Sequence, residues 1–399
     1  MYMLEGYLKK LSEYFKFGKL KLVYVGLFLA NIKQFCSKSH IIPYTEMIDD
    51  VLSVLILGIF LLVILKQTFT YKQLIVYGII SVLTIYSAFV SGYMIIAITV
   101  LTILAIRQEN VDDIAVFLFK CKSFFLGLNT IVVLLFWGVG IAEISTIYEA
   151  GTRERIHFGY GMPAHFANYI LDLIVLWLWL KHKKAKTRDY ILLSMVSIVT
   201  YLCTDSRVIF VVSLMLILGS FGIKKTKIFN RLLSMVTKLI IPLVTGVMFL
   251  IIYLFAKGSS IAYAIDAMLN TRIRLNGYRL EQYGLTLFGQ YCANVSEGYN
   301  PVWMTKGGAY DNTYMWLCIN MGAIWLIILG VCFYKLSKMR RPLLNLLLIV
   351  WALAAVVDTD FLNGMSTFII LLMTLVLDKN KIINEGHDEN SAYNKTCNI

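Results

Sequence analysis

Apolar runs about as long as a bilayer is thick recur along the whole of this 399-residue sequence. A helix needs about 20 mostly apolar residues to cross a hydrocarbon core of about 30 Å. The runs are continuous and lack the alternation of barrel strands, so helices are expected. Hydrophobic residues make up 59% of the chain and charged residues only 15%, which excludes an ordinary soluble globule. The sequence therefore predicts an all-α, polytopic integral membrane protein.

Hydropathy predicts about twelve transmembrane helices. They cover residues 20–35, 47–65, 73–90, 92–106, 123–141, 163–180, 189–204, 206–222, 232–255, 312–334, 343–357 and 360–377. The predicted division is a cytoplasmic N-terminal segment (1–19), helices one to nine (20–255), a large extracytoplasmic loop (256–311), helices ten to twelve (312–377) and a cytoplasmic tail (378–399). The N-terminal segment shows no small-residue cleavage site. Seven cysteines without a CxxC pair favour neither a zinc site nor a disulfide framework.

The basic residues predict the orientation of the chain. If both termini lie on one side, 27 of the 37 lysines and arginines fall on that side. The positive-inside rule then makes both termini cytoplasmic. The net charge of +13 mostly records this topology, so nucleic-acid binding is not expected.

Arginine is enriched on the predicted outer side, where only 4 of the 26 lysines lie, namely Lys33, Lys38, Lys257 and Lys306. The outer arginines are 6 of 11: Arg153, Arg155, Arg207, Arg272, Arg274 and Arg279. Topology alone would not select guanidinium over ammonium, but bidentate pairing with phosphate or carboxylate would. The alternative is salt bridging to outer acids such as Glu154, Asp205 and Glu281.

An outer loop leads into the predicted helix that starts near Pro163, a residue tolerated at a helix start. His165, Asn168 and Asp172 follow at spacings that place them on one helical face. A carboxylate inside the membrane, as predicted for Asp172, marks either a functional cavity or a buried group hydrogen-bonded to another helix.

Three further polar groups fall on the predicted outer side. Arg207 follows Asp205 and Ser206 in a tight turn, where it is either a ligand-binding residue or a snorkelling side chain beside a helix cap. In the large loop Arg272 and Arg279 share a helical face, which would suit a cavity lid or an amphipathic interfacial helix. Asp358 and Asp360 form a D-x-D pair that could hold a divalent cation, but so short a motif does not establish one.

The stretch GAYDNTYMWLCINMGAIW resembles the superfamily of O-antigen ligases and Wzy-type polysaccharide polymerases. Many of these ligases carry a His, then Asn, Ser or Gln, nine residues and a glycine. Asp311, Asn312 and Gly322 have that spacing here. Asp311 replaces the ligase histidine and Trp325 the second glycine, so the start resembles the polymerase branch. The Thr-Asp-Ser-Arg turn and the large late loop extend the resemblance to about residues 150–335.

The resemblance implies a GT-C-like glycosyltransferase in the bacterial cytoplasmic membrane. Such an enzyme joins undecaprenyl-diphosphate-linked oligosaccharide repeats at the outer face, for capsule, O-antigen or exopolysaccharide. A flippase and a chain-length regulator would be its partners in that membrane. No cofactor is expected, and the sequence holds no G-x-x-x-x-G-K-[ST] loop for ATP.

The residues suggest roles within that reaction. Asp311 is predicted to be the base, with Arg207 and Arg279 holding the diphosphate in a reaction that inverts the anomeric carbon. The predicted substrate-binding residues are Arg153, Arg155, His165, Asn168, Asp172, Arg272, Asn312 and Tyr314. An O-antigen ligase is one alternative. A flippase for the lipid-linked repeat is another, although flippases usually show two similar halves and no internal repeat is visible here.

Overall fold

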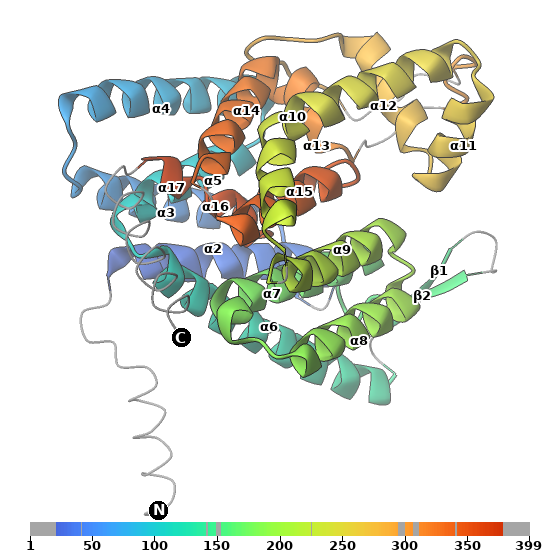
Figure 1. Ribbon diagram of the computed structural model, residues 1–399, viewed down its shortest axis with the longest axis horizontal. Helices are drawn as coiled ribbons and strands as arrows, with labels where there is room; N and C mark the ends of the chain where they lie inside the picture. Colours follow the sequence, from blue (N-terminus) through green and yellow to red (C-terminus); the bar gives the residue numbers. More distant parts are fainter. Residues whose placement is uncertain are drawn as a thin grey trace, which may run out of the picture.

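The computed structural model describes residues 21–40, 42–140, 143–148, 153–224, 226–293, 300–305, 311–339 and 341–377. Most of this part of the chain is helical (Figure 1). The helices are α2 (Leu22–Lys38), α3 (Glu46–Leu65), α4 (Tyr71–Ser91), α5 (Ile95–Ala105), η1 (Ile106–Gln108), α6 (Val111–Gly138), α7 (Pro163–Lys181), η2 (His182–Lys184), α8 (Thr187–Thr204), α9 (Arg207–Ile223), α10 (Lys227–Ala256), α11 (Ser260–Met268), α12 (Arg272–Tyr283), α13 (Thr313–Trp316), the π-helical η3 (Leu317–Gly322), α14 (Ala323–Ser337), α15 (Pro342–Ala354), η4 (Thr359–Leu362), α16 (Phe368–Leu371) and α17 (Thr374–Leu377).

Among the residues that the structure describes, six helices are long and apolar enough to cross a membrane: Glu46–Leu65, Tyr71–Ser91, Val111–Gly138, Pro163–Lys184, Phe229–Ala256 and Thr313–Ser337. Within the same described part of the chain, four shorter apolar helices cover Ile95–Gln108, Arg207–Ile223, Pro342–Ala354 and Phe368–Leu377. The predicted class of helical membrane protein agrees with this architecture. The number of twelve crossings remains a prediction.

The apolar helix α15 lies in the middle of the molecule. In the view of Figure 1 it lies between α6–α9 on one side and α10, α12 and α14 on the other. It packs against α9, α10 and α14, and its residues from Leu344 to Ala352 are all buried. A helix that is apolar on every face is stable only when it is surrounded.

A short hairpin precedes α7. Strand β1 (Ser145–Tyr148) pairs antiparallel with β2 (Arg153–Ile156), with Ser145 opposite Ile156. The sequence analysis predicted no strand here. A second pairing follows, because Ser39, after α2, forms an isolated bridge with Tyr160. The end of α2 is thereby fixed beside the start of α7.

The last apolar run does not form the single helix that was predicted over residues 360–377. It is divided into η4, a connection over residues 363–367, α16 and α17. Non-helical backbone at membrane depth is tolerated where protein satisfies it. Here the Thr99 hydroxyl donates to the Leu362 carbonyl and accepts from the Gly364 N–H, while Asp172 accepts from the Phe368 N–H. Hydropathy cannot reveal such a break, because these partners lie on distant helices.

The position of Lys122 also differs from the prediction, which placed this residue in a cytoplasmic connection before a helix over 123–141. Helix α6 begins twelve residues before that predicted start, at Val111. Its cap is Asn110, whose side chain accepts from the Asp112 N–H. Lys122 therefore lies inside the helix and is only 2% exposed.

Candidate functional site

The D-x-D segment lies where three parts of the chain meet. One Asp358 carboxylate oxygen accepts from the Asp360 backbone N–H at 2.8 Å, which caps η4. The other oxygen accepts from the Asn168 side chain on α7. The Asp358 backbone carbonyl accepts from the Thr313 hydroxyl at 2.7 Å, at the start of α13. Asp358 thus links the end of α15 to α7 and α13.

Asp360 faces two basic side chains from other helices. Its carboxylate lies 2.7 Å from the Lys38 Nζ and 3.9 Å from the His165 Nε2. Lys38 Nζ lies 3.1 Å from the same imidazole nitrogen. Because an ammonium only donates, His165 Nε2 must accept, which places the imidazole proton on Nδ1. The sequence singled out His165 and Asn168, and the structure brings both to the D-x-D pair.

Backbone hydrogen bonds bring Lys38 to this position. The Gly161 N–H donates to the Lys38 carbonyl at 2.6 Å, and the His40 N–H donates to the Gly159 carbonyl at 2.8 Å. These bonds hold residues 38–40 against the segment that enters α7. From the sequence, Lys38 is only one of four lysines on the predicted outer side, and that unusual placement is the one signal for its role.

Asp311 belongs to the same group of charges. Its carboxylate lies 3.8 Å from Arg272 Nη2, at the start of α12, and its side chain is 55% exposed. Partial burial raises the pKa of Asp311, Arg272 opposes that shift, and the charge of Asp360 adds to it. We call Asp311, Asp358 and Asp360 the carboxylate cluster.

The carboxylate cluster can hold a proton near neutral pH. Loss of hydration raises the pKa of Asp358 to about 7, and the neighbouring Asp360 charge contributes to the shift. Carboxyl groups whose environments separate their pKa values are suited to proton transfer. The cluster therefore offers a group that can accept a proton from a substrate hydroxyl.

Other predicted arginines form separate ion pairs. Arg155 Nη2 lies 3.2 Å from one carboxylate oxygen of Asp205, and Arg207 Nε lies 3.6 Å from the other. Arg274 Nε lies 2.7 Å from the fully buried Asp266. Salt bridging to acids, the alternative raised from the sequence, is thus observed for these three residues. Arg153 lies in β2, and its side chain is outside the described residues.

Arg279 is buried within the large loop and only 1% exposed. Its guanidinium donates to the Ala293 carbonyl at 2.6 Å and lies 5.7 Å from the centre of the Tyr283 ring. These contacts order the loop. Among the described ion pairs, Arg272 is the residue of the large loop that contacts Asp311. The sequence favoured Arg279 of this loop, as a ligand of the diphosphate.

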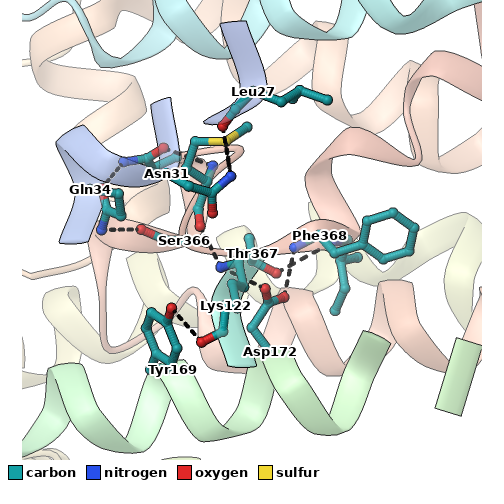
Figure 2. A network of polar contacts seen from close by, with 12 residues as sticks. Leu27, Asn31, Gln34, Lys122, Tyr169, Asp172, Ser366, Thr367 and Phe368 are labelled. Atoms are coloured by element: carbon teal, nitrogen blue, oxygen red, sulfur yellow. Dashed lines mark hydrogen bonds and ion pairs between the residues drawn. The ribbon is translucent and has the colours of Figure 1, made fainter. Parts of the chain in front are cut away.

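Asp172 forms a buried ion pair with Lys122, as Figure 2 shows. The two charged atoms are 2.9 Å apart, and both side chains are 2% exposed. Lys122 also donates to the Met365 carbonyl. This is the second alternative raised for Asp172, a buried group bonded to other elements, and it fixes the backbone that follows the D-x-D segment.

The residues of the family-like motif hold the backbone together. The Asn312 side chain caps α13 by accepting from the Met315 N–H and donates to the Val356 carbonyl. The Tyr314 hydroxyl donates to the Ala352 carbonyl, and its side chain is fully buried. These contacts position Asp311 beside the end of α15, and they engage the polar groups that the sequence analysis assigned to substrate.

Gly322 has a structural requirement. Its φ angle is +101°, and an added Cβ would lie 2.4 Å from the Leu287 carbonyl oxygen. The preceding π segment accepts hydrogen bonds from the loop, including one from the Gln290 N–H to the Asn320 carbonyl. The glycine therefore allows residues 286–290 to dock on the helix.

A metal ion does not fit the D-x-D segment well. Among the described residues, no group of three or more histidine, cysteine, aspartate or glutamate side chains could hold one. The Lys38 ammonium already occupies the place that a cation would take beside Asp360.

Comparisons of the chain with protein-family models, curated proteins and solved structures give no match. The resemblance found in the sequence therefore remains a prediction.

Proposed function

We propose that this protein is a membrane glycosyltransferase that polymerises polysaccharide from undecaprenyl-diphosphate-linked oligosaccharide repeats. The observation that carries the proposal is the carboxylate cluster, which lies beside Lys38 and Arg272 at one end of a bundle of apolar helices. A sugar diphosphate is an activated donor. The protein needs to supply a base for the acceptor hydroxyl and positive charge for the departing diphosphate.

Helix direction supports a site at the outer face. Successive spanning helices run in opposite directions, so α2 and α15 end where α7 and α13 begin. The lysine-rich connection over residues 181–186 lies at the opposite end. Under the positive-inside rule, the end with the carboxylate cluster is then extracytoplasmic. Lipid-linked repeats would meet the cluster there.

In the proposed step, Asp311 removes the proton of the acceptor hydroxyl. The oxygen then forms a bond to the anomeric carbon of the donor as the bond from that carbon to the phosphate oxygen breaks. The electron pair leaves with the lipid diphosphate, and Arg272 stabilises the added charge. Attack opposite the leaving group inverts the anomeric carbon. A positioned base contributes about 10²- to 10⁴-fold to such a rate.

Several features make Asp311 the preferred base. It is the most exposed member of the carboxylate cluster, whereas Asp358 is engaged by Asn168 and Asp360 by Lys38. The raised pKa of Asp311 makes its carboxylate a better proton acceptor than an ordinary aspartate.

The first experiment is a gel of surface glycan and lipid-linked intermediates from a deletion strain. Loss of polymer with single repeats exposed on the outside supports a polymerase. Repeats trapped on the inside would mean a flippase, and full-length polymer kept on the lipid carrier would mean a ligase. Either of those two outcomes would refute the proposal.

Complementation then tests the residues. Asp311→Asn and Arg272→Gln should restore little polymer although the protein reaches the membrane. Asp113→Asn is the matched control, because this exposed carboxylate lies in the first turn of α6, at the opposite end of the bundle. Normal polymer from Asp311→Asn would remove it from the mechanism. Arg207→Lys and Arg279→Lys test the two arginines favoured by the sequence.

A further inference from the structure

A small chamber with several polar side chains in its lining lies beside the carboxylate cluster. Its volume is about 20 Å³, and its lining includes Gln34, Lys38, Tyr160, His165, Asn168 and Asp360. A cavity of about 10–15 Å³ is enough for one water-sized group. The chamber can therefore take a hydroxyl or the end of a hydroxymethyl arm, while a whole sugar ring would remain at its mouth.

Three buried polar atoms on the lining residues have no hydrogen-bond partner among the described residues. They are Tyr160 Oη, His165 Nδ1 and Asn168 Oδ1. Tyr160 is only 1% exposed, so water at the protein surface does not satisfy its hydroxyl. Buried polar groups are nearly always paired, so several exceptions around one cavity call for a partner there, either a water molecule or a ligand group.

The chemistry of the lining selects a neutral ligand that both donates and accepts. Tyr160 and Lys38 can donate, and Asn168 and Asp360 can accept. The charges of Lys38 and Asp360 offset each other at 2.7 Å. A phosphate would gain one cation but would also meet the Asp360 carboxylate. A carbohydrate hydroxyl matches the set, because it is neutral and fills both roles.

We propose that this chamber is a carbohydrate subsite that binds a hydroxyl or hydroxymethyl group of the acceptor sugar through Tyr160, Asn168 and Asp360. The identification of the sugar as the acceptor rests on the proposed function. Sugar binding itself does not. The subsite orients the sugar so that another of its hydroxyls reaches the carboxylate cluster.

Saturation-transfer NMR tests the subsite without turnover. The full chain in lipid nanodiscs is mixed with methyl glycosides of glucose, galactose, mannose and N-acetylglucosamine. At least one glycoside should receive saturation, and Tyr160→Phe should lower that transfer at least threefold. Tyr71→Phe is the matched control, because Tyr71 is 78% exposed at the start of α4, at the other end of the bundle.

Two measurements separate binding from folding. Tyr160→Phe removes only a hydroxyl without a partner, so its melting temperature should equal or exceed that of the parent protein. A lower melting temperature would mean that the hydroxyl has a structural partner, and would overturn the subsite. The same conclusion follows if no glycoside receives saturation, if Tyr160→Phe transfers as well as the parent, or if inorganic pyrophosphate displaces the glycoside from the parent and Tyr71→Phe alike.

The subsite and the polymerase can fail separately. If saturation transfer to the purified protein depends on Tyr160 but deletion of the gene leaves polymer intact, the sugar subsite is supported and the polymerase is refuted. If the deletion strain loses polymer but Tyr160→Phe leaves the KM for the acceptor unchanged, the polymerase is supported and the subsite is refuted.

Discussion

Replacing Lys122 with methionine should strongly destabilise the protein. Lys122 is paired with Asp172 at 2.9 Å, and both side chains are 2% exposed. The methionine keeps an apolar stem of similar length but leaves the Asp172 carboxylate without its counter-charge. The Met365 carbonyl also loses its donor. Breaking a buried pair from one side costs about 3–5 kcal/mol, because an uncompensated charge remains.

A second substitution should recover most of that loss. In Lys122→Met with Asp172→Asn, the buried charge is gone, while the asparagine oxygen can still accept from the Phe368 N–H, the bond made by Asp172 at 2.7 Å. The double variant should therefore be more stable than Lys122→Met alone. Lys120→Met, two residues earlier and exposed, should change stability by no more than about 1 kcal/mol, the usual range for an exposed charged side chain.

Reversible unfolding of the purified proteins in mixed micelles measures these differences. The double-mutant cycle gives the coupling between the two residues. A Lys122→Met variant as stable as Lys120→Met would refute the reasoning, since it would show that the pair is hydrated. Simple additivity in the double variant would refute it equally.

Three further variants test the surroundings of the site, each by equilibrium unfolding. Because the raised pKa of Asp358 lets the native state hold a proton that the unfolded chain has lost, the contribution of Asp358 to stability should fall as pH rises from about 4 to about 7. Asp358→Asn should lose that contribution relative to the parent protein, and the same pH dependence of stability in both proteins would contradict the assignment. Asn312→Ala loses a helix cap and the bond to the Val356 carbonyl, and should cost about 1–3 kcal/mol. Gly322→Ala should cost at least about 1–3 kcal/mol for its backbone strain, whereas Gly330→Ala, whose nearest contact would be 3.8 Å away, should be neutral or stabilising.

Hydropathy was sufficient to predict the helical membrane class, because bilayer-length apolar runs have few other solutions. It misplaced features that depend on distant partners. Lys122 was read as a loop residue because a lysine usually ends a transmembrane run, whereas Asp172 and the Met365 carbonyl together make its burial possible. The last run was read as one helix because Thr99 and Asp172, which satisfy its broken backbone, lie far away in the sequence.

The candidate site was predictable in part. Spacing placed His165 and Asn168 on one face of α7, and both reach the D-x-D pair. Motif spacing selected Asp311 and the large loop selected Arg272, which pair with each other. Lys38 could not be assigned, since its position depends on backbone pairing between residues 38–40 and 159–161. A sequence shows the charges but not which of them share a chamber.

The distribution of charge indicates where the donor diphosphate and the acceptor sugar would lie in the proposed substrate complex. The carboxylate cluster sets three acids against Lys38 and Arg272, so it does not attract a diphosphate unless one acid is protonated. At the same end of the bundle, the guanidinium groups of Arg155 and Arg207 lie side by side at the Asp205 carboxylate. We therefore expect the diphosphate on the side of the arginines, with Arg272 at the boundary, and the acceptor sugar on the side of the carboxylates. Arg207→Gln should then raise the KM for the lipid-linked donor and leave the KM for the acceptor unchanged. If only the KM for the acceptor changed, the acceptor rather than the diphosphate would lie on the side of the arginines.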